Sequence, residues 1–404
     1  MELFCPEKSE QGDKGVKKGD NKKQSHGYIF FCIIRCKFFA NSNRKNCVRS
    51  VVGYIYRRTR LQFAIMTDHL FDAFDLATAA AWELAAREEL QGDDPWKKLT
   101  RQQGAHPVKP IYFPPPDFSE TFQIPAATGS VRGPRSWYNC PRVTVHDPNQ
   151  ANAEALEHLQ QGADGIFFEL GRALDFRQLL KNIQWPYCSL SFTAAENESE
   201  HIKGLQAYLK QEKEPAIGAW YGSSFPATAS HESFRFAGLT LSADATPETL
   251  ADGIAKATKH NNGVDTALRI NIGTDFFMEA SRLRAIRAVW SKALAHLNKS
   301  DVRLFIHAFS PAWIPEGYQP HGNMIKATTA AMAAILGGCD ALTIEPEDPS
   351  NTMMNRVARN VGNILREESH FNKVADPLAG SYYIDELTRL LTNELWNLIQ
   401  PKIS

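Results

Sequence analysis

The sequence predicts an α/β fold, namely a (β/α)8 TIM barrel with an irregular N-terminal arm. Runs of strand-like residues alternate with stretches of helical periodicity, which is the pattern of a parallel barrel. The eight strand-like runs are 142–146, 165–170, 187–192, 216–221, 237–242, 268–273, 303–307 and 341–345. Helical stretches lie between most of them, most clearly at 151–160, 247–259, 276–297 and 324–336. An open doubly wound sheet fits less well, because no glycine-rich phosphate loop follows the first run.

Residues 1–65 differ from the rest in composition. They carry fourteen Lys and Arg against five acidic residues, whereas the whole chain of 404 residues has a formal net charge of zero. This asymmetry indicates a basic extension that is disordered or foreign to the native protein, with Met66 as an alternative start. The other interpretation is a disordered basic tail that binds anionic partners.

Three further regions follow the extension. Residues 66–141 predict an N-terminal helix and a proline-rich extended arm, which either wraps a neighbouring subunit or serves as a surface connector. The barrel is expected over 142–390, and 391–404 would be the beginning of a linker.

Composition excludes several classes of function. Zero net charge favours no nucleic acid, and no run approaches the roughly 18 apolar residues that span a bilayer. The seven cysteines are scattered without the paired spacing of zinc ligands. We therefore expect a cytoplasmic protein with reduced thiols, no metal site, no membrane segment and no nucleic-acid partner.

Alternation along the strands separates two faces of the expected barrel. The face expected to pack on helices carries Leu190, Leu239, Leu241, Ile270, Ile272, Leu304, Ile306, Leu342 and Ile344. The opposite, inner face carries Thr144, Ser189, Ser191, Gly218, Gly238, Thr240, Ser242, Asn271, Ala341 and Thr343. Most barrels fill this space with bulky residues, so small hydroxylic ones indicate an axis that admits an elongated ligand. The alternative is that Phe167, Trp220 and Phe305 fill the space.

The carboxyl ends of barrel strands are where catalytic groups lie. The inward-facing candidates there are His146, Glu169, Trp220, Ser242, His307 and Glu345. Either histidine could act as an acid or base with one of the glutamates. A lone histidine at a strand end is more often a structural hydrogen-bonding group, and we favour that interpretation.

Four segments, in order, resemble the adenosylcobalamin-dependent acyl-CoA mutases, methylmalonyl-CoA mutase above all. They are FFMEASRLRAIRAVW at 276–290, NMIKATTAAMAAILGGCDALTIEP at 323–346, RVARNVGNILREES at 356–369 and DPLAGSYYIDELT at 376–388. We interpret their residues as scaffold and not as catalytic groups. In this family, acyl-CoA threads a barrel lined by small polar side chains toward cobalamin on the C-terminal face. The resemblance therefore implies substrate-binding candidates at Ser189, Ser191, Thr240, Ser242, Asn271, His307, Ser310 and Glu345.

Several family motifs are missing. SWYNCPRV at 136–143 stands where catalytic chains have Arg-Gln-Tyr-Ala-Gly-Phe, and the loop with the catalytic histidine is deleted after Ser242. An Arg-Thr-His motif becomes Phe305-Ile306-His307, although His307 and Ser310 remain at matching positions. The cobalamin motif Asp-x-His-x-x-Gly does not occur, so residues 391–404 resemble a truncated linker to a cobalamin domain. We expect no catalytic residue and no cofactor on this chain.

The resemblance implies the small subunit of a methylmalonyl-CoA mutase of propionate metabolism, which interconverts methylmalonyl-CoA and succinyl-CoA. Its partner would be the catalytic large subunit, which binds adenosylcobalamin and is stabilised in a heterodimer. Two alternatives remain open. The chain could be an active barrel subunit that works with a separate cobalamin-binding chain, or a non-enzymatic acyl-CoA-binding barrel.

Overall fold

The computed structural model describes residues 78–404 except 104–105, 114–122, 128–129, 173, 212–214, 223–233, 242–245, 262–264, 300–301 and 311–321. The basic extension 1–65 and Ser242 with its shortened loop lie outside these residues. The chain forms two compact units, residues 1–98 and 99–404. Helix α3 (Ala79–Glu89) of the first unit begins at Thr78, whose side chain accepts a hydrogen bond from the Ala81 amide.

The second unit is an α/β structure built on two five-stranded parallel sheets, with strand orders β3-β12-β11-β10-β9 and β4-β5-β6-β7-β8. This confirms the α/β class and the parallel strands. The strands are β3 (Tyr138–Asn139), β4 (Arg142–Val145), β5 (Gly165–Leu170), β6 (Ser189–Ala194), β7 (Ile217–Tyr221), β8 (Phe234–Arg235), β9 (Gly238–Leu241), β10 (Thr266–Asn271), β11 (Leu304–Phe309) and β12 (Ala341–Thr343). A short antiparallel hairpin, β1 (Arg101–Gln103) and β2 (His106–Val108), precedes them.

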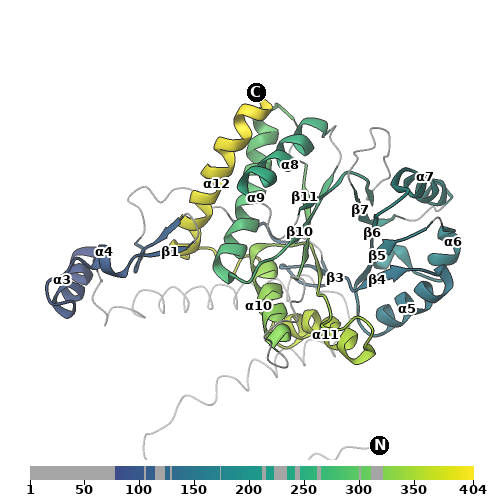
Figure 1. Ribbon diagram of the computed structural model, residues 1–404, viewed down its shortest axis with the longest axis horizontal. Coiled ribbons are helices and arrows are strands. Elements are labelled where there is room, and N and C mark those ends of the chain that lie inside the picture. Colours follow the sequence, from purple (N-terminus) through teal and green to yellow (C-terminus); the bar gives the residue numbers. More distant parts are fainter. Residues whose placement is uncertain are drawn as a thin grey trace, which may run out of the picture. The chain divides into compact units, whose positions relative to one another are not determined.

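Helices cover the outer faces of both sheets (Figure 1). They are α5 (Pro148–Gln160), α6 (Phe176–Leu179), α7 (Glu198–Leu209), α8 (Pro247–His260), α9 (Phe276–His296), α10 (Gly322–Gly337), α11 (Thr352–Glu367) and α12 (Tyr382–Ile403), with a 3-10 turn at Trp185–Tyr187. The short helix α4 (Pro95–Leu99) precedes β1. Helix α12 packs beside α8 and α9 and runs through residue 390, where the sequence analysis placed a boundary. The predicted domain boundaries remain predictions.

Local chemistry explains where the main helices begin. Asp147, Thr246, Asp275 and Asn351 each precede a helix and accept hydrogen bonds from amides of its first turn. Such caps satisfy amides that have no partner within the helix, and each contributes about 1 kcal/mol. Proline at the first position of α5 and α8 supports the same starts.

The predicted helix-facing surface of the strands is confirmed. Leu241, Ile270, Ile272, Leu304, Ile306, Leu342 and Ile344 lie in one buried cluster with α8, α9, α10 and α12, and Leu239 packs against it. Leu190 lies in the equivalent cluster of the other sheet. Full burial of one such side chain contributes about 1.5–3 kcal/mol, so this surface holds the helices on the sheets.

Two family-like segments meet in a buried ion pair. Arg284 of α9 is fully buried and donates to Asp376 Oδ1 over 2.6 Å. Asp376 Oδ2 also accepts the Ile124 amide at 2.8 Å. The segment 356–369, which also resembles the mutases, lies against β3. There the Asn139 side chain donates to the Arg359 carbonyl oxygen and to Asn363. These contacts support the interpretation of the motifs as scaffold.

Two chain segments take part in both sheets. Residues 138–145 give β3 to one and β4 to the other, and the Cys140 amide donates to Leu342 O at 2.8 Å while the Phe167 amide donates to Pro141 O at 2.9 Å. Residues 234–241 likewise give β8 and β9. Beside them, the Gly222 amide donates to Gly238 O at 3.3 Å.

Gly238 allows the backbones of β7 and β9 to approach closely. A Cβ atom at this position would lie 1.9 Å from the Trp220 carbonyl oxygen, which is backbone and cannot move aside without shifting the strand. Only glycine avoids this overlap.

We predict that Gly238→Ala lowers the free energy of unfolding by about 2 kcal/mol or more, because the strands must separate. The matched control is Gly204→Ala in α7, where the new methyl group meets only Phe176 at 3.3 Å. Its effect should stay within about 1 kcal/mol, since alanine is the better helix former. Urea unfolding followed by circular dichroism measures both, and equal effects would contradict the proposed close approach.

Candidate functional site

Strand register identifies the side chains that lie opposite the helix-facing surface. On β11 these are Phe305, His307 and Phe309, which pair with Ala267, Arg269 and Asn271 of β10. Side chains of both sheets form one buried cluster, which we call the inner cluster. Its apolar members are Cys140, Phe167, Ala219, Tyr221, Ala267, Phe305, Phe309 and Ala341, with Tyr138 packed against them.

The expectation of a small, hydroxylic inner face is only partly correct. Ser189, Ser191 and Thr343 are buried there as expected, but large rings lie among them. Phe167 meets Phe309 with ring centroids 4.8 Å apart and Tyr221 at 6.1 Å. The alternative in which large side chains fill this space is therefore right for Phe167 and Phe305.

Two residues of β7 face the other way from the prediction. Gly218 pairs with Leu190 and not with Ser189 or Ser191, so it lies on the helix-facing side. Trp220 stacks on Phe192 in the helix-facing cluster. The physical reason is that a Cβ atom at Gly218 would lie 1.8 Å from the Leu190 carbonyl oxygen, so glycine is needed for strand contact there and not to open the axis.

His307 is fully buried within the inner cluster. The centroids of Phe309, Phe167 and Tyr221 lie 4.6, 5.6 and 5.7 Å from that of its imidazole. Its Nε2 lies 2.9 Å from Thr343 Oγ1, and that hydroxyl donates to the Cys140 carbonyl oxygen at 2.6 Å. Because the hydroxyl has one proton, Nε2 must be the donor to Thr343, which leaves Nδ1 as an acceptor.

The electrostatics around His307 favour its neutral form. Burial lowers the pKa of the imidazole well below its usual range, and the positive charge of Arg269 adds to this effect. The guanidinium of Arg269 lies over the rings of Phe309 and Phe167, with its carbon 4.3 and 5.0 Å from their centroids. Desolvation there also lowers the pKa of Arg269.

Several buried polar atoms of this region have no hydrogen-bond partner among the residues that the structure describes. They are Ser189 Oγ, Ser191 Oγ, Tyr221 Oη, Arg269 Nε and His307 Nδ1. Leaving a buried donor or acceptor unpaired costs about 1–3 kcal/mol, so such atoms normally bind ordered water or a polar ligand. Burial also raises the pKa of the Tyr221 hydroxyl, which keeps it neutral.

Charged side chains gather at the start of β4, near the carboxyl end of β5 and just after β12. Arg142 lies 2.9 Å from Glu345 and 3.5 Å from Glu169, and Thr144 donates to Glu169 at 3.3 Å. Burial raises the pKa of Glu345 despite the nearby Arg142 and Arg269. The carboxylates therefore neutralise guanidinium groups here and are held in pairs.

The predicted site residues occupy three kinds of position. Ser189, Ser191 and His307 are buried in or beside the inner cluster. Ser310 and Glu345 meet at the strand ends, where Ser310 Oγ accepts the Glu345 amide at 2.8 Å. Thr240 is exposed and Asn271 half-buried on the inner side, and His146 is exposed.

Arg142, Arg269 and Tyr221 were not predicted from the sequence as residues of the inner face or of the site. A usable signal existed for Arg269, because an arginine between Leu268 and Ile270 in an otherwise apolar strand must face a different environment from its neighbours. No such signal existed for Tyr221, because either residue of the Trp220-Tyr221 pair could face inward.

The arrangement is suited to holding polar groups more than to proton transfer. The one lone pair of His307 that could act as a base is enclosed by three rings, and a general base must reach the proton that it removes. Among the described residues there is no cluster of three or more His, Cys, Asp or Glu that could hold a metal ion. None of the described helices has the length and apolar character needed to cross a bilayer.

Comparisons with known proteins agree with the four motifs. Residues 250–403 match the family described as Methylmalonyl-CoA mutase. A protein of Porphyromonas gingivalis named methylmalonyl-CoA mutase small subunit is 27% identical over 392 residues, which are 82% of this chain and 63% of that protein. The mutase small subunit of Streptomyces virginiae is 26% identical over 68% of this chain and 53% of its own length.

A protein of Propionibacterium freudenreichii subsp. shermanii named methylmalonyl-CoA mutase large subunit is 32% identical over 32% of this chain and 19% of its own length. The chain thus spans less than two thirds of the length of each of these relatives. The resemblance inferred from the motifs is confirmed.

We predict that His307 makes stability depend on pH. Below the ordinary imidazole pKa of 6.5 the unfolded chain binds a proton that the folded chain excludes, so the stability contributed by neutral His307 is present above pH 6.5 and is lost as the pH falls. The gap in unfolding free energy between wild type and His307→Gln should therefore narrow from pH 7.5 to 5.5. Urea titrations at several pH values measure it.

Phe309→Leu is the control for this experiment, because it makes a cavity in the same cluster without removing a titratable group. Its deficit relative to the wild type should stay nearly constant with pH. If the difference in unfolding free energy between wild type and His307→Gln also stays constant from pH 7.5 to 5.5, the result would contradict a buried neutral imidazole.

Proposed function

We propose that this chain, whose residues 250–403 match the methylmalonyl-CoA mutase family and whose relatives include mutase small subunits, is the small subunit of such a mutase. In this proposal it has no catalytic site and stabilises a large subunit that carries out the isomerisation. The observation that most supports the lack of a catalytic site is the enclosure of His307 by Phe167, Tyr221 and Phe309.

We also infer that the two sheets are halves of one closed (β/α)8 barrel. The hydrogen bonds from Cys140 to Leu342 and from Phe167 to Pro141 support one junction. The bond from Gly222 to Gly238 supports the other. Rings from both sheets packed in one inner cluster are what a closed barrel requires, because its interior is a filled core.

The residues at the strand ends do not fit a cobalamin site. The family binds cobalt through the histidine of an Asp-x-His-x-x-Gly motif, which does not occur in this sequence. His307 is buried and its Nε2 is engaged by Thr343. Glu169 and Glu345 each pair with Arg142 and offer no imidazole to a corrin metal. We therefore assign the cofactor to the partner chain and derive no step through it here.

A second candidate, an acyl-CoA-binding barrel, has one observation in its favour. The unpaired atoms of Ser189, Ser191, Tyr221 and His307 would be satisfied by a polar group that entered the inner cluster. The close packing of the rings opposes it, because a thioester would have to displace Phe167 or Phe309.

The experiment is co-expression of this chain with a large mutase subunit, followed by purification through a tag on this chain. We expect a heterodimer that isomerises methylmalonyl-CoA when adenosylcobalamin is added, whereas this chain alone is inactive. Isomerisation by this chain with only a small cobalamin-binding protein would overturn the proposal. Tight binding of acyl-CoA by the lone chain in calorimetry would favour the second candidate.

We further predict that His307→Gln in this chain leaves kcat/KM of the heterodimer within about twofold of the wild-type value. Loss of a group that acts in acid–base catalysis would instead lower it by about 10²–10⁴. The matched control is Thr343→Val, which removes the hydroxyl that binds His307. This variant should also leave kcat/KM of the heterodimer within about twofold of the wild-type value. A large decrease in both, with the heterodimer intact by gel filtration, would mean that the inner cluster takes part in the reaction.

A further inference from the structure

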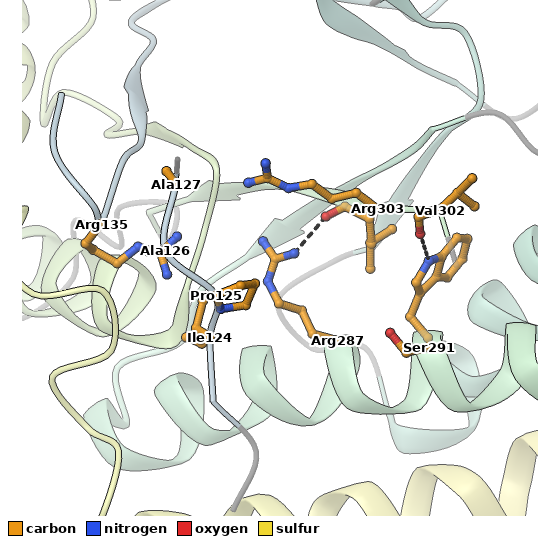
Figure 2. Close-up of a pocket in the computed structure, with 11 residues that line it drawn as sticks. Ile124, Pro125, Ala126, Ala127, Arg135, Arg287, Ser291, Val302 and Arg303 are labelled. Atoms are coloured by element: carbon orange, nitrogen blue, oxygen red, sulfur yellow. Dashed lines mark hydrogen bonds between the residues drawn. The ribbon is translucent and has the colours of Figure 1, made fainter. Parts of the chain in front are cut away.

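A cavity of about 280 Å³ lies beside α9, outside the inner cluster (Figure 2). Its walls come from residues 124–127, from α9 and from the chain entering β11. Arg135, Arg287 and Arg303 line it together with apolar groups that include Ile124, Pro125 and Trp290. Pockets that bind small molecules begin at about this size and usually combine apolar walls with a few polar groups.

Two of the three arginines share one carboxylate. Arg287 donates to Asp340 Oδ2, to Gly338 O and to Leu304 O, and Arg303 donates to Asp340 Oδ1. The Ile306 amide gives Asp340 a third donor at 2.8 Å. Burial alone would raise the pKa of Asp340, but these groups outweigh it and lower the pKa to about 2. Asp340 is therefore ionised and fully engaged.

Among the described residues, Arg135 has no comparable partner. It is only 2% exposed, and its Nε and Nη1 are buried with no hydrogen-bond acceptor in the described part of the chain. Nη1 lies 3.3 Å from the position of a Cβ atom at Gly338, so the guanidinium is held closely against that turn. A buried guanidinium remains charged, and its unpaired donors represent a free-energy cost that an acceptor would remove.

The charges that line the cavity do not cancel. Three guanidinium groups line the cavity, whereas one carboxylate, that of Asp340, pairs with two of them and the charge of Asp265 also acts on Arg303, so positive charge is in excess among the described residues around it. Figure 2 shows the side chains of Arg135, Arg287 and Arg303 turned toward the same space beside Ala126 and Ala127. A phosphate monoester carries −1.5 to −2 charges at neutral pH and three acceptor oxygens, which match this surplus better than one carboxylate.

We propose that this cavity binds the phosphate monoester of a small organic molecule, with the phosphoryl group on Arg135 and Arg303. The organic part would lie against Ile124, Pro125 and Trp290. The indole is fixed for this role, because its Nε1 donates to Val302 O at 2.8 Å. All residues of this site belong to this chain. The site can therefore be tested on the chain alone, independently of the proposed subunit function.

Isothermal titration calorimetry of the full chain at fixed ionic strength tests the site with three probes. Phenyl phosphate should bind best, inorganic phosphate about tenfold more weakly for lack of apolar contacts, and benzoate about tenfold more weakly for its lower charge. Benzoate binding as tightly as phenyl phosphate would overturn the choice of a phosphate ester in favour of a carboxylate. Absence of binding by all three probes would overturn the site itself.

Two variants locate the binding. Arg135→Gln and Arg303→Gln should each weaken phenyl phosphate about tenfold or more, as expected for the loss of charge-assisted hydrogen bonds. The Arg303 side chain is 59% exposed, so that variant should fold even if Arg135→Gln does not. The matched control is Arg389→Gln, an equal change of charge at an exposed position of α12, which should bind like the wild type. Arg303→Gln binding as tightly as Arg389→Gln would contradict the proposal.

Discussion

The packing of Phe167 against Phe309 is the contact on which the rest of this structure depends. One ring comes from β5 and the other from β11, which belong to different sheets, and their centroids are 4.8 Å apart in an edge-to-face arrangement. Because the rings belong to different sheets, their contact sets the distance between the sheets. His307 and Arg269 then occupy the remaining space against the same two rings. The polar groups of the interior are thus arranged by an aromatic core.

Alternation of side chains was enough to predict the helix-facing surface but not the content of the inner one. Leu268 and Ile270 of β10 and Leu304 and Ile306 of β11 stand at alternate positions, which indicates the side that meets the helices. In β7 the same rule fails, because Gly218 looks like a small inward residue although strand contact with Leu190 requires it. A shift of one residue exchanges Trp220 and Tyr221 between the faces. Which aromatic ring fills the interior therefore depends on contacts between strands distant in sequence.

The two ends of the strand layer differ in charge, and β12 contributes to both. Asp340 precedes this strand and Glu345 follows it. Near the carboxyl end of β5 and just after β12, Glu169 and Glu345 face Arg142 and Arg269, so charges balance. At the amino end, Asp340 is outnumbered by Arg135, Arg287 and Arg303. Barrel enzymes have their active sites at the carboxyl end. Among the described residues of this chain, the excess of positive charge lies at the opposite end, beside α9.

The family-like segments account for the scaffold and say little about chemistry. Arg284 and Asp376 join two of them in a buried pair, and Asn139 ties a third to β3. A buried pair of this kind is costly to break on one side only, because the remaining charge is left without a partner. Such residues hold the fold together, whether or not the chain catalyses a reaction. Resemblance carried by these segments therefore concerns the scaffold, and the chemistry depends on the inner cluster, where three aromatic rings enclose the imidazole of His307.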